Sequence, residues 1–423
     1  MAPERYNFKN ILKTLGPGFL FAGAAIGGSH LIQSTRAGAN FGFELLWLIL
    51  LTNFLKYPFF EFGQRYVAAT GKNLIDGYAK IGKWAVVIFY VLNIVVALAN
   101  TAGVTIVTAG LTENFLHFFW NIETNSNLMS AIILVGTLLI LFLGRYALLV
   151  KILKILIITL AITTVISVIV ALGAGMQAPE GFMPPEIMNK VGIGFIIALL
   201  GWMPAPIESS VWTSFWTEER TAQTQYRPKL KEHLIDFYGG FFGTAVLAVI
   251  FMSLGALVMY GTGQEFPSSG IAFSSQLVKL YSETLGGWAT PIITTIAMIT
   301  MISTVLTVLD AYPKSLTISQ QHIFGAKRTR KMNFIWAIIL SIIAFIIITN
   351  FTYRMKDLID LATVISFLAA AFFAVINYMV VHNKNFPEEY KPGKFTNVVS
   401  WLGLTFLISF SIFYILTRIG LIF

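Results

Sequence analysis

The sequence predicts an all-α polytopic membrane protein with eleven transmembrane helices. Hydrophobic residues make up 56% of the 423 residues and charged residues only 12%, whereas a soluble domain carries about 25% charged residues. The apolar residues are gathered into stretches of roughly 20, the length that a helix needs to cross a bilayer. Two of these stretches are interrupted near their middle by residues that disfavour a helix. The interruptions locate the candidate site.

The apolar stretches define the expected spans. Their predicted bounds are residues 14–38, 43–67, 84–116, 128–147, 149–174, 191–216, 234–260, 288–312, 332–350, 357–382 and 398–421. Residues 271–287 are amphipathic, which predicts an external loop or a surface helix rather than a span. Cysteine is absent, so disulfides and thiolate metal sites are excluded.

Positive charge gives the expected orientation. With a cytoplasmic N-terminus and alternating spans, most of the 29 lysine and arginine residues fall on the cytoplasmic side, as the positive-inside rule requires. The basic residues 1–13 precede an apolar run without a small-residue cleavage pattern, which indicates a first span rather than a removed signal peptide. We therefore expect a multi-pass protein of the plasma or inner membrane with its C-terminus outside. The expected partners are the lipid bilayer and a small solute or metal ion, not nucleic acid, and the oligomeric state is left open.

The two interruptions are Ile26-Gly27-Gly28-Ser29-His30 in span 1 and Met203-Pro204-Ala205-Pro206 in span 6. Adjacent glycines and paired prolines weaken a helix. Irregular backbone inside a membrane persists only where protein or a water-filled cavity surrounds it. Paired interruptions in equivalent positions of two halves indicate the substrate site of a transporter. Because an odd number of spans separates them, spans 1–5 and 6–10 are expected to be inverted repeats.

This arrangement predicts a single membrane transport domain over residues 1–423. The first repeat is expected at 1–175, the second at 190–395 and an additional helix at 396–423. A channel is a less suitable interpretation, because paired interruptions favour one occluded site over a pore lined by rings of residues. An enzyme is not expected, because no metal-hydrolase, catalytic-triad or phosphate-loop motif is present.

Candidate binding residues surround the interruptions. They are Gly27, Gly28, Ser29, His30, Met203, Pro204, Ala205 and Glu208. Glu208 is either a carboxylate directed at the substrate or an acid that stabilises the N-terminus of the helix behind Pro206. Met203 is either a thioether ligand or a packing residue. His30 is a ligand, a proton switch or a structural partner.

Further ionisable residues lie within the expected spans, where burial in lipid costs a few kcal/mol or more each. Lys56 and Glu61 in span 2 are close enough to form a structural ion pair, or each finds another partner. Asp310 in span 8 either pairs with Lys314 four residues later or belongs to a path for a coupling ion. Asn100 in span 3 is a second candidate for such a path.

Several motifs resemble those of one transporter family. They are Gly16-Pro17-Gly18 and Arg36-Ala37-Gly38-Ala39-Asn40-Phe41-Gly42 around span 1, Leu45-Leu46-Trp47 and Ala69-Thr70-Gly71-Lys72-Asn73-Leu74 around span 2, and Met203-Pro204 in span 6. With these motifs the chain resembles the Nramp (natural resistance-associated macrophage protein) family of divalent-metal transporters. The resemblance implies a LeuT-like fold, alternating access and a divalent metal ion of the Mn and Fe class as substrate. No resident cofactor is expected besides the transported ion.

The candidate site departs from the family's pattern. Where the family has Asp-Pro-Gly-Asn in span 1, this chain has Gly27, Gly28, Ser29 and His30. Ala205 replaces the histidine of the family's Met-Pro-His motif in span 6, and the acidic pair of span 3 falls at Asn100 and Gly103. The chain therefore resembles a divergent member. A metal ion would depend on His30, Met203 and Glu208 as ligands.

The same region supports an alternative substrate. If a half-helix begins at Gly27-Gly28-Ser29, its free N–H groups and positive dipole end suit an anionic or zwitterionic small solute. Loss of the aspartate with retention of the glycines is the change that such a solute would favour.

Overall fold

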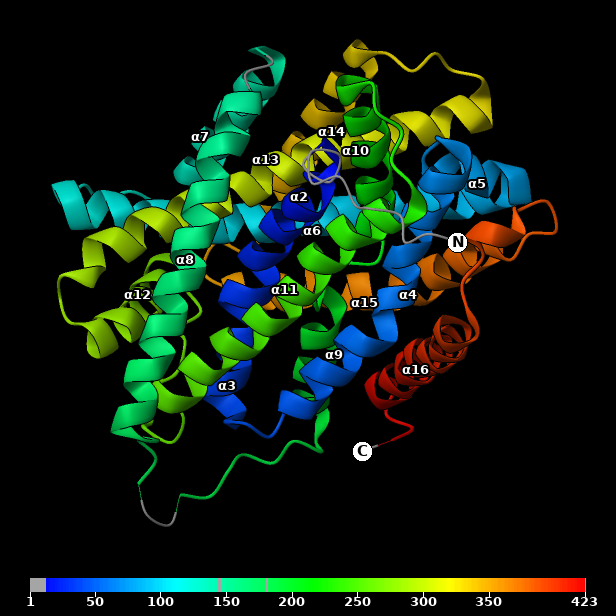
Figure 1. The fold of residues 1–423 in the computed structure, drawn as a ribbon. Coiled ribbons are helices and arrows are strands. Elements are labelled where there is room, and N and C mark those ends of the chain that lie inside the picture. Colours follow the sequence, from blue (N-terminus) through cyan, green and yellow to red (C-terminus); the bar gives the residue numbers. More distant parts are fainter. Residues whose placement is uncertain (1–12, 144–145, 180–181, 423) are drawn as a thin grey trace.

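The computed structural model describes residues 13–143, 146–179 and 182–422, and every regular element in this part of the chain is a helix (Figure 1). The prediction of an all-α protein is confirmed. Residues 1–12, on which the orientation prediction partly depends, lie outside the described residues. Arg145, in the expected first repeat, and Phe423, in the expected additional helix, also lie outside the described residues.

Seven helices in the described part of the chain are long and apolar enough to cross a membrane. They are α6 (Lys83–Trp120), α7 (Ser126–Leu143), α11 (Leu230–Val258), α13 (Ala289–Phe324), α14 (Arg330–Thr349), α15 (Met355–Val381) and α16 (Lys394–Arg418). Two more expected spans are the helix α4 (Leu46–Thr70), which carries Lys56 and Glu61, and α8 (Tyr146–Ala174). The remaining two are composite. Helical structure thus occurs at each expected span.

The composite spans differ from each other in how the helix is interrupted. In span 6, α9 (Lys190–Trp202) ends at Met203, and α10 (Ser209–Thr224) begins after a non-helical stretch. In span 1, α2 (Pro17–Ala25) continues without a gap into a π-helix, η1 (Ile26–Ser34), which leads into α3 (Thr35–Phe41). The interruption at Gly27-Gly28 therefore widens the helix to i→i+5 hydrogen bonding, whereas the two prolines of span 6 break it.

Two shorter helices connect the spans. The amphipathic segment predicted at 271–287 forms α12 (Gly270–Leu285), whose apolar side packs against α6. The segment after α4 forms α5 (Leu74–Ile81), which is capped by Asn73, whose side chain accepts hydrogen bonds from the Ile75 and Asp76 N–H groups. A short 3₁₀ turn, η2 (Glu388–Tyr390), precedes α16.

Span 1 is held against α11 by close contact between backbones, and the two lie together at the centre of Figure 1. A Cβ atom at Gly38 would lie 1.9 Å from the Met252 carbonyl oxygen, and one at Gly255 would lie 2.2 Å from the Thr35 carbonyl oxygen. Small residues allow such contact between membrane helices. On another side, Arg36 joins span 1 to Asp360 of α15 through an ion pair of 2.7 Å. These contacts fix η1 in the interior.

Candidate functional site

Both interruptions border one small central cavity, which has a volume of about 30 Å³ for water-sized molecules. Its walls come from α2 and η1, α6, the break between α9 and α10, and α13. The polar and aromatic side chains or glycines that line it are Gly28, Ser29, Asn100, Trp202, Trp212, Thr304 and Tyr312, together with Ala205 and Pro206. The expected meeting of the two interruptions is therefore present in the structure.

Glu208 is fully buried and lies behind the cavity wall, where it contacts the lining residues Tyr312 and Asn100. Its Oε1 atom accepts hydrogen bonds from the Tyr312 hydroxyl at 2.8 Å and the Asn100 Nδ2 group at 3.3 Å. Its Oε2 atom has no hydrogen-bond partner among the described residues. Glu208 occupies the N-cap position of α10, but its side chain makes no capping hydrogen bond. The side chain is thus directed to α6 and α13 and does not cap α10, and its substrate-facing role stays a prediction.

Asn100 links Glu208 to the wall of the cavity. Its Oδ1 atom accepts hydrogen bonds from Trp202 Nε1 at 3.1 Å and the Ser366 hydroxyl at 3.0 Å. Its Nδ2 group also lies 2.7 Å from the Tyr312 hydroxyl oxygen. The amide therefore orients an indole ring of span 6 and a carboxylate at once. The prediction that Asn100 lines a path is compatible with this position.

His30 does not face the cavity. Its Nδ1 atom is 2.8 Å from the Ala25 carbonyl oxygen, and its Nε2 atom is 2.7 Å from the Thr244 carbonyl oxygen. Carbonyl oxygens can only accept hydrogen bonds, so each ring nitrogen is directed at backbone of α2 or α11. This geometry corrects the prediction of His30 as a metal ligand and favours the structural interpretation, because a ligand nitrogen must present a free lone pair.

Met203 and Gly27 are not among the residues that line the cavity. Met203 is fully buried in the apolar core, which favours its packing interpretation over that of a thioether ligand. A Cβ atom on Gly27 would lie 2.2 Å from Thr304 Oγ1, so this glycine allows η1 to approach α13. Pro204, which follows Met203 in a cis peptide bond, supplies the break and not a ligand.

The hypothesis of a helix N-terminus at Gly27-Gly28-Ser29 is also corrected. These residues lie inside η1, which continues α2 without a break, so their N–H groups belong to a helical hydrogen-bonding pattern. The segment retains one polar group for a ligand, the Ser29 hydroxyl, which is buried and has no partner in the described part of the chain.

Lys56 and Glu61 do not pair with each other. Glu61 accepts hydrogen bonds of 2.5 Å from both Arg65 Nε and the Tyr238 hydroxyl. The Lys56 ammonium group instead lies against main-chain carbonyl oxygens at the end of α9. The sequence showed a lysine deep in span 2, but it contained no signal for partners about one third of the chain away.

Asp310 forms the ion pair that its spacing predicted. Lys314 Nζ lies 2.9 Å from Asp310 Oδ2 and 3.2 Å from Glu219 Oε1 of α10. Asp310 is outside the described lining of the central cavity. Lys314 therefore joins α13 to Glu219 of α10, and the place of Asp310 in a coupling path stays a prediction.

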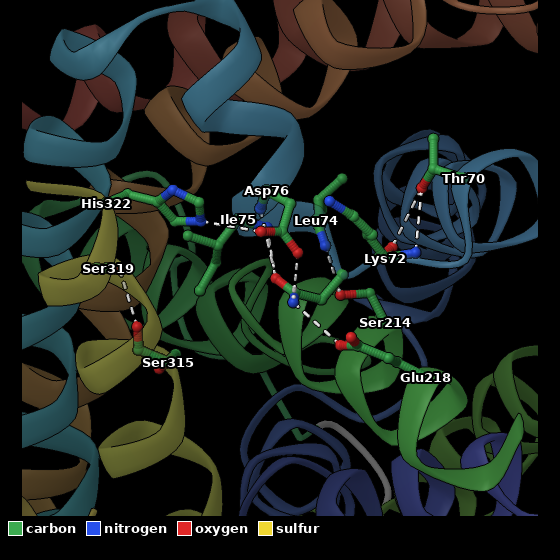
Figure 2. Close-up of polar contacts among 11 residues, drawn as sticks. Thr70, Lys72, Leu74, Ile75, Asp76, Ser214, Glu218, Ser315, Ser319 and His322 are labelled. Carbon is green, nitrogen blue, oxygen red and sulfur yellow. Dashed lines mark hydrogen bonds and ion pairs between the residues drawn. The ribbon is translucent and has the colours of Figure 1, made fainter. Parts of the chain in front are cut away.

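A polar network connects the end of α10 to α5 and α13, as Figure 2 shows. Asn73 Nδ2 donates to Asp76 Oδ2 at 2.8 Å and to Glu218 Oε2 at 3.0 Å, while Asp76 Oδ1 lies 2.9 Å from His322 Nε2. The Leu74 N–H group donates to the Ser214 hydroxyl at 2.9 Å. Glu218 lies beyond the expected end of span 6, and burial raises the pKa of its carboxyl group. This network ties the second half of an interrupted span to its neighbours.

The described residues contain no group of three or more His, Asp or Glu side chains that could hold a metal ion. Around the central cavity, Glu208 is the acidic side chain that the structure provides. Ser29 adds a hydroxyl oxygen without a partner among the described residues, whereas Asn100 Oδ1 is already hydrogen-bonded to Trp202 and Ser366. The arrangement is therefore a weakly charged, oxygen-based site with aromatic walls.

Comparison with known proteins identifies the family. The family model described as natural resistance-associated macrophage protein-like matches residues 18–417, so the chain belongs to the Nramp family. An uncharacterized protein of Pasteurella multocida is 36% identical over 99% of this chain and 95% of its own length. A protein of Oryza sativa named metal transporter Nramp3 is 28% identical over 48% of this chain and 36% of its own length.

A solved structure shows the same fold. A mutant form of the manganese transporter of Eremococcus coleocola superposes with a TM-score of 0.74 over 99% of this chain and 90% of that chain, at 16% identity. Together with other neighbours of the LeuT type, this likeness confirms the expected LeuT-like fold. The fold and the family are those of a multi-pass membrane transporter.

Proposed function

We propose that this protein is a secondary transporter that moves a divalent metal ion by alternating access through the central cavity. The family and its relatives named as metal transporters support this class of substrate. Within the site, the unpartnered Oε2 atom of Glu208 carries the proposal. A buried carboxylate oxygen without a hydrogen bond is unfavourable, and a cation that binds it removes the penalty.

The donor atoms favour a hard or borderline ion. Glu208 would supply the charged oxygen, and the Ser29 hydroxyl would supply a neutral oxygen at the cavity wall. Oxygen donors suit Mn²⁺ better than the softer copper and zinc ions, which prefer sulfur and nitrogen. We therefore propose Mn²⁺ as the preferred ion of the Mn and Fe class, bound with part of its water shell.

The two kinds of interruption suggest how the site opens. The break between α9 and α10 and the π-helical η1 let the halves of spans 6 and 1 tilt separately. The bundle containing spans 1 and 6 would then move against the other helices to expose the cavity to each side in turn. We propose that the N-terminus is cytoplasmic, the C-terminus is outside and the membrane is the plasma or inner membrane.

A small organic solute is a second candidate, because three aromatic side chains line the cavity. Trp202, Trp212 and Tyr312 surround a space with few polar atoms, and such walls are typical of pockets for small molecules. In a widened form of the cavity, a zwitterionic solute would place its apolar part against these rings and its ammonium group towards Glu208 behind the wall.

A ligand-stabilisation screen on the purified protein separates the two substrates. If a metal ion is the cargo, Mn²⁺ raises the unfolding temperature in a saturable manner, and amino acids and carboxylates leave it unchanged. The Glu208→Gln variant should lose this response while retaining the fold. Stabilisation of the wild type by an organic solute, with no response to any divalent ion, would contradict the metal proposal.

A further inference from the structure

The Lys56 ammonium group occupies a cage of carbonyl oxygens at the broken end of α9. Its Nζ atom lies 2.6 Å from the Leu200 oxygen, 3.3 Å from the Gly201 oxygen and 3.0 Å from the Met203 oxygen. Lys56 is fully buried, and its three partners belong to one turn of backbone about 145 residues further along the chain. Three contacts to one short segment use all three protons of the ammonium group.

These carbonyl groups are available because the helix stops there. The last carbonyl groups of a helix lack their regular partners within the helix, and α9 ends at Met203 before the two prolines. The Leu200 oxygen accepts one further, long hydrogen bond of 3.4 Å from the Met203 N–H group. The C-terminal end of a helix also carries partial negative charge. In transporters with interrupted helices, such carbonyl ends coordinate a coupling cation. The free carbonyl oxygens and the partial negative charge at the end of α9 therefore form a site for a cation.

The charges around Lys56 agree with this assignment. Within the described residues Lys56 forms no ion pair, although Glu61 is about one and a half turns away on the same helix. Glu208, on the other side of the break, is the acidic group that interacts with the ammonium group electrostatically. The positive charge of Lys56 is thus balanced mainly by direct contact with the α9 carbonyl groups. The more distant Glu208 carboxylate adds to this electrostatically.

We propose that Lys56 is a tethered cation that fills the ion site at the end of α9, in place of a free sodium or potassium ion. The site itself is a carbonyl cage for a monovalent cation, formed by Leu200, Gly201 and Met203, and Lys56 keeps it permanently occupied. Removing the ammonium group vacates the cage. The inference depends on the geometry of α9 and α4, and it holds whichever cargo the central cavity binds.

The test compares unfolding temperatures in choline, sodium and potassium chloride at equal ionic strength. Wild-type protein is expected to unfold at the same temperature in all three salts. The Lys56→Ala variant is expected to be less stable in choline chloride and to regain several degrees with sodium or potassium, in a saturable manner, because the ion binds only the folded cage. Methylammonium, which resembles the lost group, should also restore stability.

Two further variants make the result specific. Lys56→Met removes the charge but fills the space, so it should be destabilised without rescue by any ion. Lys279→Ala removes a half-exposed lysine that pairs with Glu283, and it should behave as the wild type does. A Lys56→Ala protein that folds only with the ion bound can still be tested. It is purified in sodium chloride and then exchanged into choline chloride, where it should lose stability.

Several outcomes would overturn the proposal. They are a Lys56→Ala protein equally stable in all three salts, one that fails to fold in any of them, and a wild type that itself depends on sodium or potassium. Because the measurement is stability and not uptake, failure of the metal proposal leaves this result unaffected.

Discussion

The Tyr312 hydroxyl group donates a hydrogen bond of 2.8 Å to Glu208 Oε1, and this bond joins α13 to the break in span 6. Both residues are fully buried. The bond occupies one carboxylate oxygen and leaves the other, Oε2, without a partner in the described structure. Tyr312 thereby orients the charged group of the proposed site.

Replacement of Tyr312 by phenylalanine should impair both stability and substrate binding. The change leaves Glu208 with a weaker set of donors, and a buried unsatisfied group costs about 1–3 kcal/mol. We expect a lower unfolding temperature and a reduced affinity for Mn²⁺, measured by the shift in unfolding temperature against ion concentration. Tyr281→Phe is the matched control. Tyr281 is also fully buried, but its hydroxyl group bonds Thr164 instead, so that variant should lose stability and retain the affinity of the wild type.

Gly28→Ala should close part of the central cavity. A Cβ atom at Gly28 would lie 2.5 Å from the Trp202 ring, so the indole or η1 must shift, which disturbs the hydrogen bond from Trp202 to Asn100. We expect strongly reduced transport by a folded protein, measured as uptake into proteoliposomes together with the elution profile of the purified variant. Gly136→Ala in α7, where a Cβ atom meets no atom within 4 Å, should transport normally. Normal uptake by Gly28→Ala would show that cargo does not pass this wall.

The network in Figure 2 should make stability depend on pH through Glu218. Burial raises the pKa of this carboxyl group above its ordinary value of 4.5, so the folded state holds the proton more tightly than the unfolded state. The free energy of unfolding should therefore fall as the pH rises from about 4.5 through the raised pKa. Glu218→Gln should lack this part of the slope and be more stable than the wild type at neutral pH.

Unfolding temperatures of both proteins across the pH range from about 4 to about 8 check this prediction. The Glu283→Gln variant, which alters a partly exposed carboxylate on α12, is expected to follow the wild type. If the stability of Glu218→Gln changed with pH as steeply as that of the wild type, burial of this carboxylate would not be the cause of the pH dependence.

Much of the architecture could be predicted from the sequence because a bilayer restricts backbone so strongly. Apolar stretches of spanning length indicated helices at the expected positions, and the two interruptions indicated the location of the cavity. The form of the first interruption could not be predicted. Adjacent glycines weaken a helix, but in the structure span 1 stays helical at this point, in a wider π form.

The roles of individual site residues were harder to predict. His30 is directed at the Thr244 carbonyl oxygen of α11, a contact between distant parts of the chain that no local pattern contains. The contact of Lys56 with the end of α9 also joins distant parts of the chain, so no local pattern predicts it. Glu208 could be named as a candidate because a carboxylate just behind a helix break is visible in the sequence, although its bonds to Asn100 and Tyr312 are not.

Uptake of Mn²⁺ into proteoliposomes tests the central claim most directly. The account predicts saturable uptake by the wild type and a loss of about tenfold or more in the Glu208→Gln variant, since contacts to a charged group contribute roughly 1.5–3 kcal/mol. The Glu283→Gln variant should transport as the wild type does. Absence of Mn²⁺ uptake by a folded wild-type protein, or equal uptake by Glu208→Gln, would contradict the proposed metal site.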